Sequence, residues 1–299
     1  MCFGIAGPMG PKAAYDDIIQ AGTGFTMLQT VVSPDGSPRF LPSIVCDKTS
    51  SNSVVSALLA GLFERERSGK GQSIEVPMYE SLVSFVMVEH LYGETFIPKI
   101  ESAGYKRILS KERRPYPSKD GFFCLLPYND GHWQEFCKLI DRPDILADPR
   151  FASLQTRLAN IDVVYGTMAQ VCKTRTNAEW IALLEKSNVP HGPVNTLEDL
   201  LTDPQLEATG YWTEMEHPTE GKIRMPGIAP RFSRTKPEIT RHQPTLGEHS
   251  VEVLQEFGYS KTLIDRMLAS GATQVGNKKK VGAAEAVAAA KKPAKKIGK

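Results

Sequence analysis

The chain has 299 residues, of which 41% are hydrophobic and 23% are charged, as expected for one large or two ordinary globular domains. This composition excludes a disordered chain, a collagen-like repeat and a miniprotein held together by disulfides. The net charge of +2 is unevenly spread, because residues 278–299 carry eight lysines and one glutamate and leave −5 on residues 1–277. Such a mildly acidic body argues against a nucleic-acid-binding domain.

Cysteine and histidine usage indicates neither a disulfide framework nor a metal site. The five cysteines include no CxxC pair, which favours reduced thiols in a cytosolic protein. The six histidines are scattered singly and form no zinc-binding motif. The longest apolar stretch, residues 82–88, is too short to cross a bilayer, and residues 1–30 do not resemble a signal peptide. We therefore expect a cytoplasmic protein without a membrane partner.

The first elements predict a layered α/β domain. Residues 1–8 are typical of the end of a buried strand that runs into a turn, so we expect the chain to lack the N-terminal portion of its domain. A helix-like stretch follows over residues 14–28. The clearest helix begins near Asp47, since Val54, Val55, Leu58, Leu59, Leu62 and Phe63 recur at helical spacing. A glycine turn at residues 69–71, an alternating strand at 72–76 and a helix at 79–92 complete this region.

The second half of the chain is predicted to begin with a polar connector over residues 93–114. The expected elements after it are a strand at 121–126, helices near 131–140, 157–173 and 177–187, a loop at 190–193, a short helix at 197–201, β-structure or an extended linker at 211–232, and helices at 246–257 and 261–268. Beyond residue 275 the sequence is rich in lysine and alanine and has too few apolar residues to form a core.

Asp47 is the residue with the clearest chemical potential. It follows an apolar stretch and stands at the start of a helix, where its carboxylate is suited to accept backbone N–H bonds as a cap. The same location, a loop at a helix N-terminus, is where α/β proteins bind ligands. A carboxylate there can also act as a nucleophile. The residues alone leave the structural and the catalytic interpretation open.

Several motifs, in order along the chain, resemble one enzyme family. They lie at residues 4–8, 14–21, 47, 61–72, 116–121, 148–151, 190–194 and 246–249. Together they resemble the class III CoA-transferases of the CaiB/BaiF type, which include formyl-CoA transferase, carnitine CoA-transferase and the related α-methylacyl-CoA racemase. The similarity extends from residue 4 to about residue 272.

The resemblance implies roles for particular residues. The family's aspartate at the position of Asp47 attacks an acyl-CoA thioester and ends as an aspartyl-CoA thioester, from which CoA passes to a free carboxylic acid. Lys12, Ala13, Ala14 and Tyr15 match a CoA-contacting segment, where a lysine suits a diphosphate and an aromatic ring suits the pantetheine or adenine. Asp16 is expected in the second shell of Asp47, with a plain charge at a helix start as the alternative.

Two alternatives remain. The racemases of the family need a histidine where this chain has Tyr15, and a phenol with an ordinary pKa near 10 is a poor base at neutral pH, so transfer is favoured over racemisation or epimerisation. The expected absence of an N-terminal segment leaves a non-catalytic fragment, or one that pairs with a separate N-terminal half, as the other alternative. Residues 106–115 are basic and polar, unlike the glycine-rich substrate loop of formyl-CoA:oxalate transferase, so oxalate is not indicated as acceptor. Arg107, Arg113 or Arg114 of this stretch is suited to hold another carboxylate, with plain exposed charges of a linker as the alternative.

The expected fold class is α/β, with an incomplete Rossmann-like large domain and a smaller α+β domain. We expect a CoA-binding region over residues 1–92, a linker over 93–112, the small domain over 113–214, a return to the large domain over 215–275, and a disordered tail over 276–299. The resemblance further implies an interlocked homodimer, acyl-CoA and a small carboxylic acid as substrates, and no metal or other permanently bound cofactor.

Overall fold

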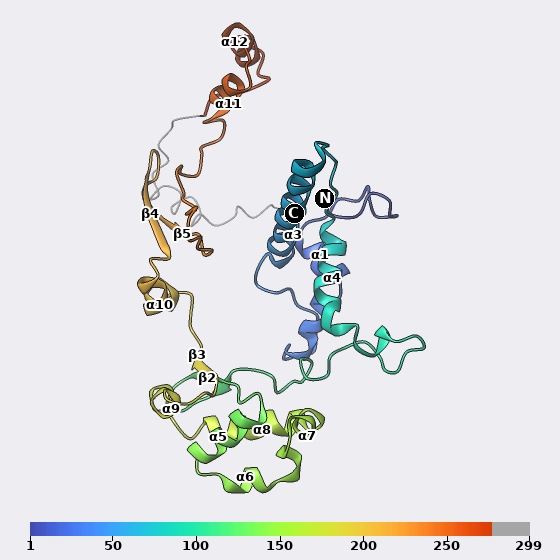
Figure 1. Cartoon of the computed structure of the whole chain (residues 1–299), viewed down its shortest axis with the longest axis vertical. Helices are drawn as coiled ribbons and strands as arrows, with labels where there is room; N and C mark the ends of the chain where they lie inside the picture. Colours follow the sequence, from blue (N-terminus) through green and yellow to red (C-terminus); the bar gives the residue numbers. More distant parts are fainter. Residues whose placement is uncertain (277–299) are drawn as a thin grey trace, which may run out of the picture. The chain divides into compact units, whose positions relative to one another are not determined.

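The computed structural model describes residues 1–276; the lysine-rich tail expected from residue 276 thus lies almost wholly outside the described residues. The chain divides into two compact units, Met1–Val194 and a second unit that begins at Asn195 (Figure 1). It has mixed α and β structure, and the described helices include none with the length and apolarity needed to cross a membrane.

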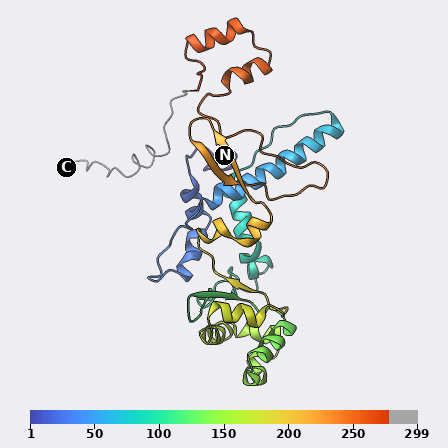
Figure 2. The same ribbon diagram turned by 90° about the vertical axis from the view of Figure 1, so that its left-hand side faces the viewer.

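The first part of unit one is helical. Its elements are α1 (Asp16–Gly22), α2 (Phe25–Leu28), the 3-10 helix η1 (Gln29–Val31), α3 (Val45–Ser68), α4 (Met78–His90) and η2 (Tyr92–Thr95). The helix expected over residues 14–28 is interrupted at Gly24, whose positive φ of 80° suits glycine. Helices α1, α3 and α4 pack together (Figures 1 and 2), and their small core contains Phe3, Ile19 and Leu82.

Two expectations for this part are wrong. Neither residues 1–8 nor residues 72–76 form a strand, and residues 1–112 contain no strand at all. A strand requires a neighbour for its backbone hydrogen bonds, and here the first residues instead meet the start of α4, where the Met78 and Tyr79 amides donate to the carbonyls of Met1 and Cys2. Glu75 likewise uses its side chain to accept from the Ile5 amide.

Helix α3 has the expected position but an unexpected surface. It spans 24 residues, and in Figure 2 its far end (light blue) extends away from α1 and α4. All six apolar residues of its predicted stripe are exposed in the single chain, between 40% for Leu62 and 65% for Phe63. No described residue of the chain therefore covers this stripe.

The second part of unit one is a small α+β assembly with its own core. Its elements are β1 (Tyr116–Pro117), β2 (Phe122–Leu125), α5 (Asp130–Leu139), α6 (Pro143–Ala147), η3 (Pro149–Phe151), α7 (Leu154–Ala159), α8 (Ile161–Cys172), α9 (Asn177–Leu184) and β3 (His191–Pro193). The three strands form an antiparallel sheet in the order β1-β2-β3. Phe123 and Leu125 of β2 face the helices and are buried, whereas Phe122 and Cys124 are exposed.

The sequence prediction for this assembly needs three corrections. Residues 191–193 were expected in a loop but form β3, because they pair with β2 in the register Phe123–Pro193. The single helix expected at 157–173 is two helices, α7 and α8, with Asn160 between them. Helix α6 was not predicted.

Unit two begins at Asn195. It contains the 3-10 helix η4 (Asp199–Thr202), α10 (Pro204–Ala208), β4 (Trp212–His217), β5 (Gly221–Pro226), α11 (Ser250–Glu256) and α12 (Lys261–Ala269). Strands β4 and β5 form an antiparallel hairpin with Trp212 opposite Pro226, in agreement with the β-structure expected over residues 211–232.

Candidate active site

The N-terminus of α3 carries Asp47 in its first turn. An aspartate here is expected to cap the helix with its own side chain, yet the capping carboxylate comes from another helix. Asp16 of α1 accepts at its Oδ1 from the amides of Cys46, at 2.7 Å, and of Asp47, at 3.0 Å. Asp16 is only 7% exposed, so it is a buried tertiary link between two segments thirty residues apart. The expected proximity of Asp16 to Asp47 is present in the structure.

Gln20 completes this link. It is fully buried, lies one turn after Asp16 on α1, and donates from Nε2 to Asp16 Oδ2 at 2.6 Å and to the Ser43 carbonyl at 3.3 Å. Its Oε1 accepts from the Leu41 amide at 3.0 Å. One amide side chain thereby holds the orientation of Asp16 and the path of the segment that leads into α3.

The carboxylate of Asp47 is left available by this arrangement. Asp47 is half-buried, and among residues 1–276 its side chain has no hydrogen-bond or ion-pair partner, since Asp16 takes the backbone donors. The positive end of the α3 dipole favours a negative charge at this point. The neighbouring Cys46 is no competing nucleophile, because burial and the nearby Asp16 raise the pKa of its thiol to about 12.

The segment expected to contact CoA, residues 12–15, immediately precedes Asp16 in the chain. Lys12, Ala13 and Tyr15 are exposed, Tyr15 to 85%, while Ala14 is half-buried. A tight turn precedes the segment, and a Cβ on Gly10 would lie 2.6 Å from the Ile5 carbonyl oxygen, so only glycine fits there. Because Tyr15 is followed at once by Asp16, the exposed strip of residues 12–15 adjoins the N-terminus of α3.

The structure thus brings together Asp47, Asp16 and the end of the 12–15 segment. Gln20 was missed by the sequence reasoning, although its spacing of four residues from Asp16 places both on one face of α1. No group of three His, Cys, Asp or Glu side chains within residues 1–276 is arranged to hold a metal ion.

The chain is similar in sequence to known CoA-transferases. The chain is 28% identical to succinyl-CoA:glutarate CoA-transferase of Mus musculus over 274 residues, which cover 90% of this chain and 62% of that protein. It is 30% identical to a succinate–glutarate CoA-transferase of Agrobacterium fabrum, over 85% of this chain and 63% of that one. The chain therefore spans a little over three-fifths of the length of these relatives.

Solved structures agree with the sequence relatives. A hypothetical protein from Mycobacterium tuberculosis superposes with a TM-score of 0.69 at 25% identity and covers 84% of this chain and 66% of its own. A CaiB/BaiF family protein from Brucella suis superposes with a TM-score of 0.64, also at 25% identity, over 86% of this chain and 66% of its own. The sequence profile of CoA-transferase family III matches residues 1–250, and the chain belongs to this family.

Proposed function

We propose that the protein transfers CoA from an acyl-CoA to a free carboxylic acid, with Asp47 as the nucleophile. An Asp47 carboxylate oxygen attacks the thioester carbonyl carbon and the CoA thiolate leaves, which gives a mixed anhydride. The thiolate then attacks the Asp47 carbonyl carbon and expels the donor acid, so that CoA is held as an aspartyl thioester. The acceptor carboxylate attacks the carbonyl carbon of this thioester and expels the CoA thiolate, which gives a second mixed anhydride. The thiolate then attacks the acceptor carbonyl carbon of this anhydride, so that acceptor acyl-CoA forms and the Asp47 carboxylate leaves unchanged.

The observation that carries the proposal is that the carboxylate of Asp16, and not that of Asp47, caps α3. Asp16 accepts the hydrogen bonds of the α3 N-terminal amides that an aspartate acting as a cap at position 47 would accept. The oxygens of the Asp47 carboxylate accept no hydrogen bond from the described residues. A half-buried carboxylate without partners has a cost in desolvation, and a covalent role explains why it is kept. Neighbouring amides that are already bonded to Asp16 hold the backbone of Asp47 in place while its side chain reacts.

We assign CoA binding to the exposed strip of residues 12–15. Lys12 has no side-chain partner among the described residues and is suited to a phosphate of CoA. The exposed ring of Tyr15 offers a flat surface to the adenine or the pantetheine chain. The CoA thioester is a substrate in these steps, and they require no permanently bound cofactor.

The family's Rossmann-like large domain and its interlocked homodimer belong to the same proposal. Residues 1–112 contribute helices to such a domain, and the uncovered stripe of α3 gives a second subunit an apolar surface to pack on. The printed names of the relatives, succinyl-CoA:glutarate and formyl-CoA:oxalate CoA-transferase, suggest short dicarboxylic acids as the first acids to test. We place the reaction in the cytoplasm.

Substitution of the nucleophile tests the mechanism. We expect Asp47→Ala to lower CoA transfer by at least about a thousandfold, since no covalent intermediate can form, and to leave the circular dichroism spectrum unchanged. The assay is mass spectrometry of CoA exchange between acyl-CoAs and a panel of carboxylic acids. Hydroxylamine added during turnover should mark Asp47 in the wild type.

Asp17→Ala is the matched control, because Asp17 is an exposed aspartate in the first turn of α1 and should keep full activity. Wild-type turnover in Asp47→Ala would contradict the mechanism, and a wild-type chain inactive on every acid would contradict transfer by this chain alone. Exchange of the substrate's α-proton with deuterated solvent, without transfer, would indicate the racemase chemistry instead.

A further inference from the structure

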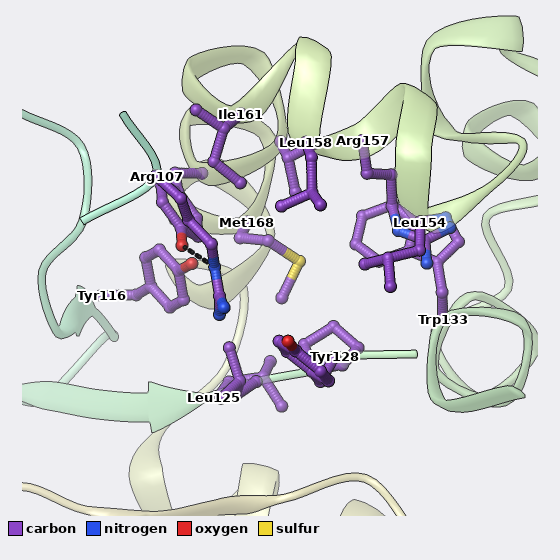
Figure 3. Close-up of a pocket in the computed structure, with 14 residues that line it drawn as sticks. Arg107, Tyr116, Leu125, Tyr128, Trp133, Leu154, Arg157, Leu158, Ile161 and Met168 are labelled. Atoms are coloured by element: carbon purple, nitrogen blue, oxygen red, sulfur yellow. Dashed lines mark hydrogen bonds between the residues drawn. The ribbon is translucent and has the colours of Figure 1, made fainter. Parts of the chain in front are cut away.

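The small α+β assembly contains a hollow to which the proposed mechanism assigns no step. The space between its walls is about 400 Å³, a volume that includes solvent at its open side. Most of its wall is apolar, with Leu125, Leu158, Ile161 and Met168 among the lining residues. Figure 3 shows Leu125 and Tyr128 on one side of this space and Leu158 and Ile161 on the other. A partly open apolar pocket of this kind suits a small ligand rather than a second polypeptide.

Two arginines line the hollow, and they differ in how their charges are balanced. Arg157 is 4% exposed and forms an ion pair with Asp130 at 2.6 Å. Arg107 is half-buried, yet among residues 1–276 it has no carboxylate partner. Its Nε donates to the Tyr165 hydroxyl at 3.2 Å, and its guanidinium lies over the Tyr128 ring at 4.7 Å. A partly desolvated cation without a counter-ion attracts an anion.

Neutral donors gather around the same cation. Tyr116 and Tyr165 both line the hollow and are each 5% exposed. Burial raises the pKa of Tyr116, so its hydroxyl keeps its proton and can donate. In Figure 3 the side chain of Arg107 points into the space beside Tyr116 and Met168, and the dashed line marks its hydrogen bond. A guanidinium and two phenols at one end of an apolar hollow match a carboxylate head with a hydrocarbon tail.

The wall of the hollow also contains a buried indole whose N–H can report whether the hollow is occupied. Trp133 lines the hollow and is only 2% exposed, and its indole Nε1 has no hydrogen-bond partner among the described residues. The other two tryptophans both donate, Trp180 to the Cys172 carbonyl at 2.9 Å and Trp212 to the Leu200 carbonyl at 3.1 Å. Buried donors without acceptors are uncommon.

We propose that this hollow is a binding site for an aliphatic monocarboxylate of short to medium chain, with the carboxylate on Arg107 and the tail among Leu125, Leu158 and Met168. The residues that line the hollow include none of the Asp47 region, so the proposal does not rest on the proposed transfer reaction. Hexanoate is the probe of choice, with butanoate and octanoate to measure the length of the tail.

The three indole N–H resonances of the ¹⁵N-labelled full chain provide the measurement. We expect hexanoate to shift the Trp133 resonance and to leave those of Trp180 and Trp212 unmoved. Arg107→Gln should weaken hexanoate binding by about tenfold or more, because a charge-assisted contact is lost. Arg107→Lys, which keeps the charge, should bind with intermediate affinity.

Arg113→Gln is the matched control, since Arg113 is an exposed arginine of the same connector that does not line the hollow, and it should bind like the wild type. An unchanged Trp180 resonance in each variant reports that the core remains folded. A Trp133 resonance that hexanoate does not move, hexan-1-ol binding as tightly as hexanoate, or an equal loss in Arg113→Gln would each overturn the proposal. Binding by Asp47→Ala equal to that of the wild type would confirm its independence of the transfer reaction.

Discussion

At the start of α3, two aspartates that are distant in the sequence have different environments. Asp16 is buried and accepts three hydrogen bonds, from the Cys46 and Asp47 amides and from Gln20. Asp47 is half-buried and its carboxylate has no partner among the described residues. Either residue is a plausible helix cap from the sequence alone. The structure gives that task to Asp16 and leaves Asp47 available for chemistry.

Removal of the Asp16 carboxylate should weaken the fold and disturb the site together. Asp16→Ala leaves two buried amides unsatisfied and should lower the free energy of unfolding by about 2 kcal/mol. Because Asp16 positions the backbone of Asp47, we also expect kcat of transfer to fall more than KM changes. Urea unfolding followed by circular dichroism, together with steady-state kinetics, measures both effects.

The matched control for this variant is again Asp17→Ala, which removes an exposed carboxylate from the same turn. It should change the free energy of unfolding by less than about 0.5 kcal/mol. Equal destabilisation by the two variants would show that Asp16 acts through its charge in the first turn of α1 and not through its bonds to α3.

At the scale of elements, α3 was correctly predicted as a helix, but the exposure of its apolar stripe was not expected. The helical spacing of its apolar residues predicted a helix, and the structure has one from Val45 to Ser68. The stripe of apolar residues is normally the face that packs on a core, yet here it is exposed. A helix of this kind is stable in water when another surface covers it.

A charge in the middle of the stripe tests whether a second subunit covers it. Leu59 is 60% exposed in the single chain, so in an isolated chain Leu59→Glu should leave the free energy of unfolding unchanged within about 0.5 kcal/mol. In the proposed homodimer the same substitution buries a charge and should dissociate the subunits. Light scattering coupled to size exclusion reports the mass of each species.

Ala60→Glu adds the same charge at an exposed position of α3 that lies outside the stripe and should leave the dimer intact. A wild-type chain that is monomeric at all concentrations, or dissociation by Ala60→Glu as well, would refute the assignment of the α3 stripe to the subunit interface.

For the molecule as a whole, stability depends on pH through ionisable groups that are buried in an apolar core. The apolar core of the small assembly contains Tyr116, Cys137 and Cys172. Burial raises the pKa of Cys137 to about 11 and that of Cys172 to about 12, from an ordinary value of 9.0, and it also raises the pKa of Tyr116. Each of these groups keeps its proton more tightly in the folded protein than in the unfolded chain.

The stability of this core should therefore fall in alkali. A group whose folded pKa is raised contributes its full stability below the unfolded value and loses it as the pH rises above that value. For the two thiols the loss begins near pH 9.0 and continues towards their folded values of about 11 and 12. Urea midpoints at neutral pH and at about pH 10 should show the decrease.

Cys172→Ala should reduce this pH dependence, whereas Cys124→Ala, at an exposed position of β2, should leave it unchanged. A urea midpoint that is constant across the alkaline range would show that the buried thiols and Tyr116 do not control the stability of the core.

Local patterns in the sequence were sufficient for the helices α3, α4, α5 and α9, for strand β2 and for the family, because helical periodicity and ordered motifs are properties of short segments. The family motifs also pointed to Asp47, and Asp16 was expected either beside it or as a plain charge at a helix start. The strand expected at residues 72–76 is absent and β3 was missed, because a strand depends on a partner that the segment itself does not contain.

Only the tertiary structure decided which aspartate caps α3, which of the two arginines in the hollow has no carboxylate partner among the described residues, and which apolar stripe those residues leave exposed. Each of these depends on distances between side chains that are far apart in the chain, such as Asp16 and the amide of Asp47. The sequence determined the segments and their chemistry, and the packing of those segments determined which polar groups are satisfied and which remain free to bind or react.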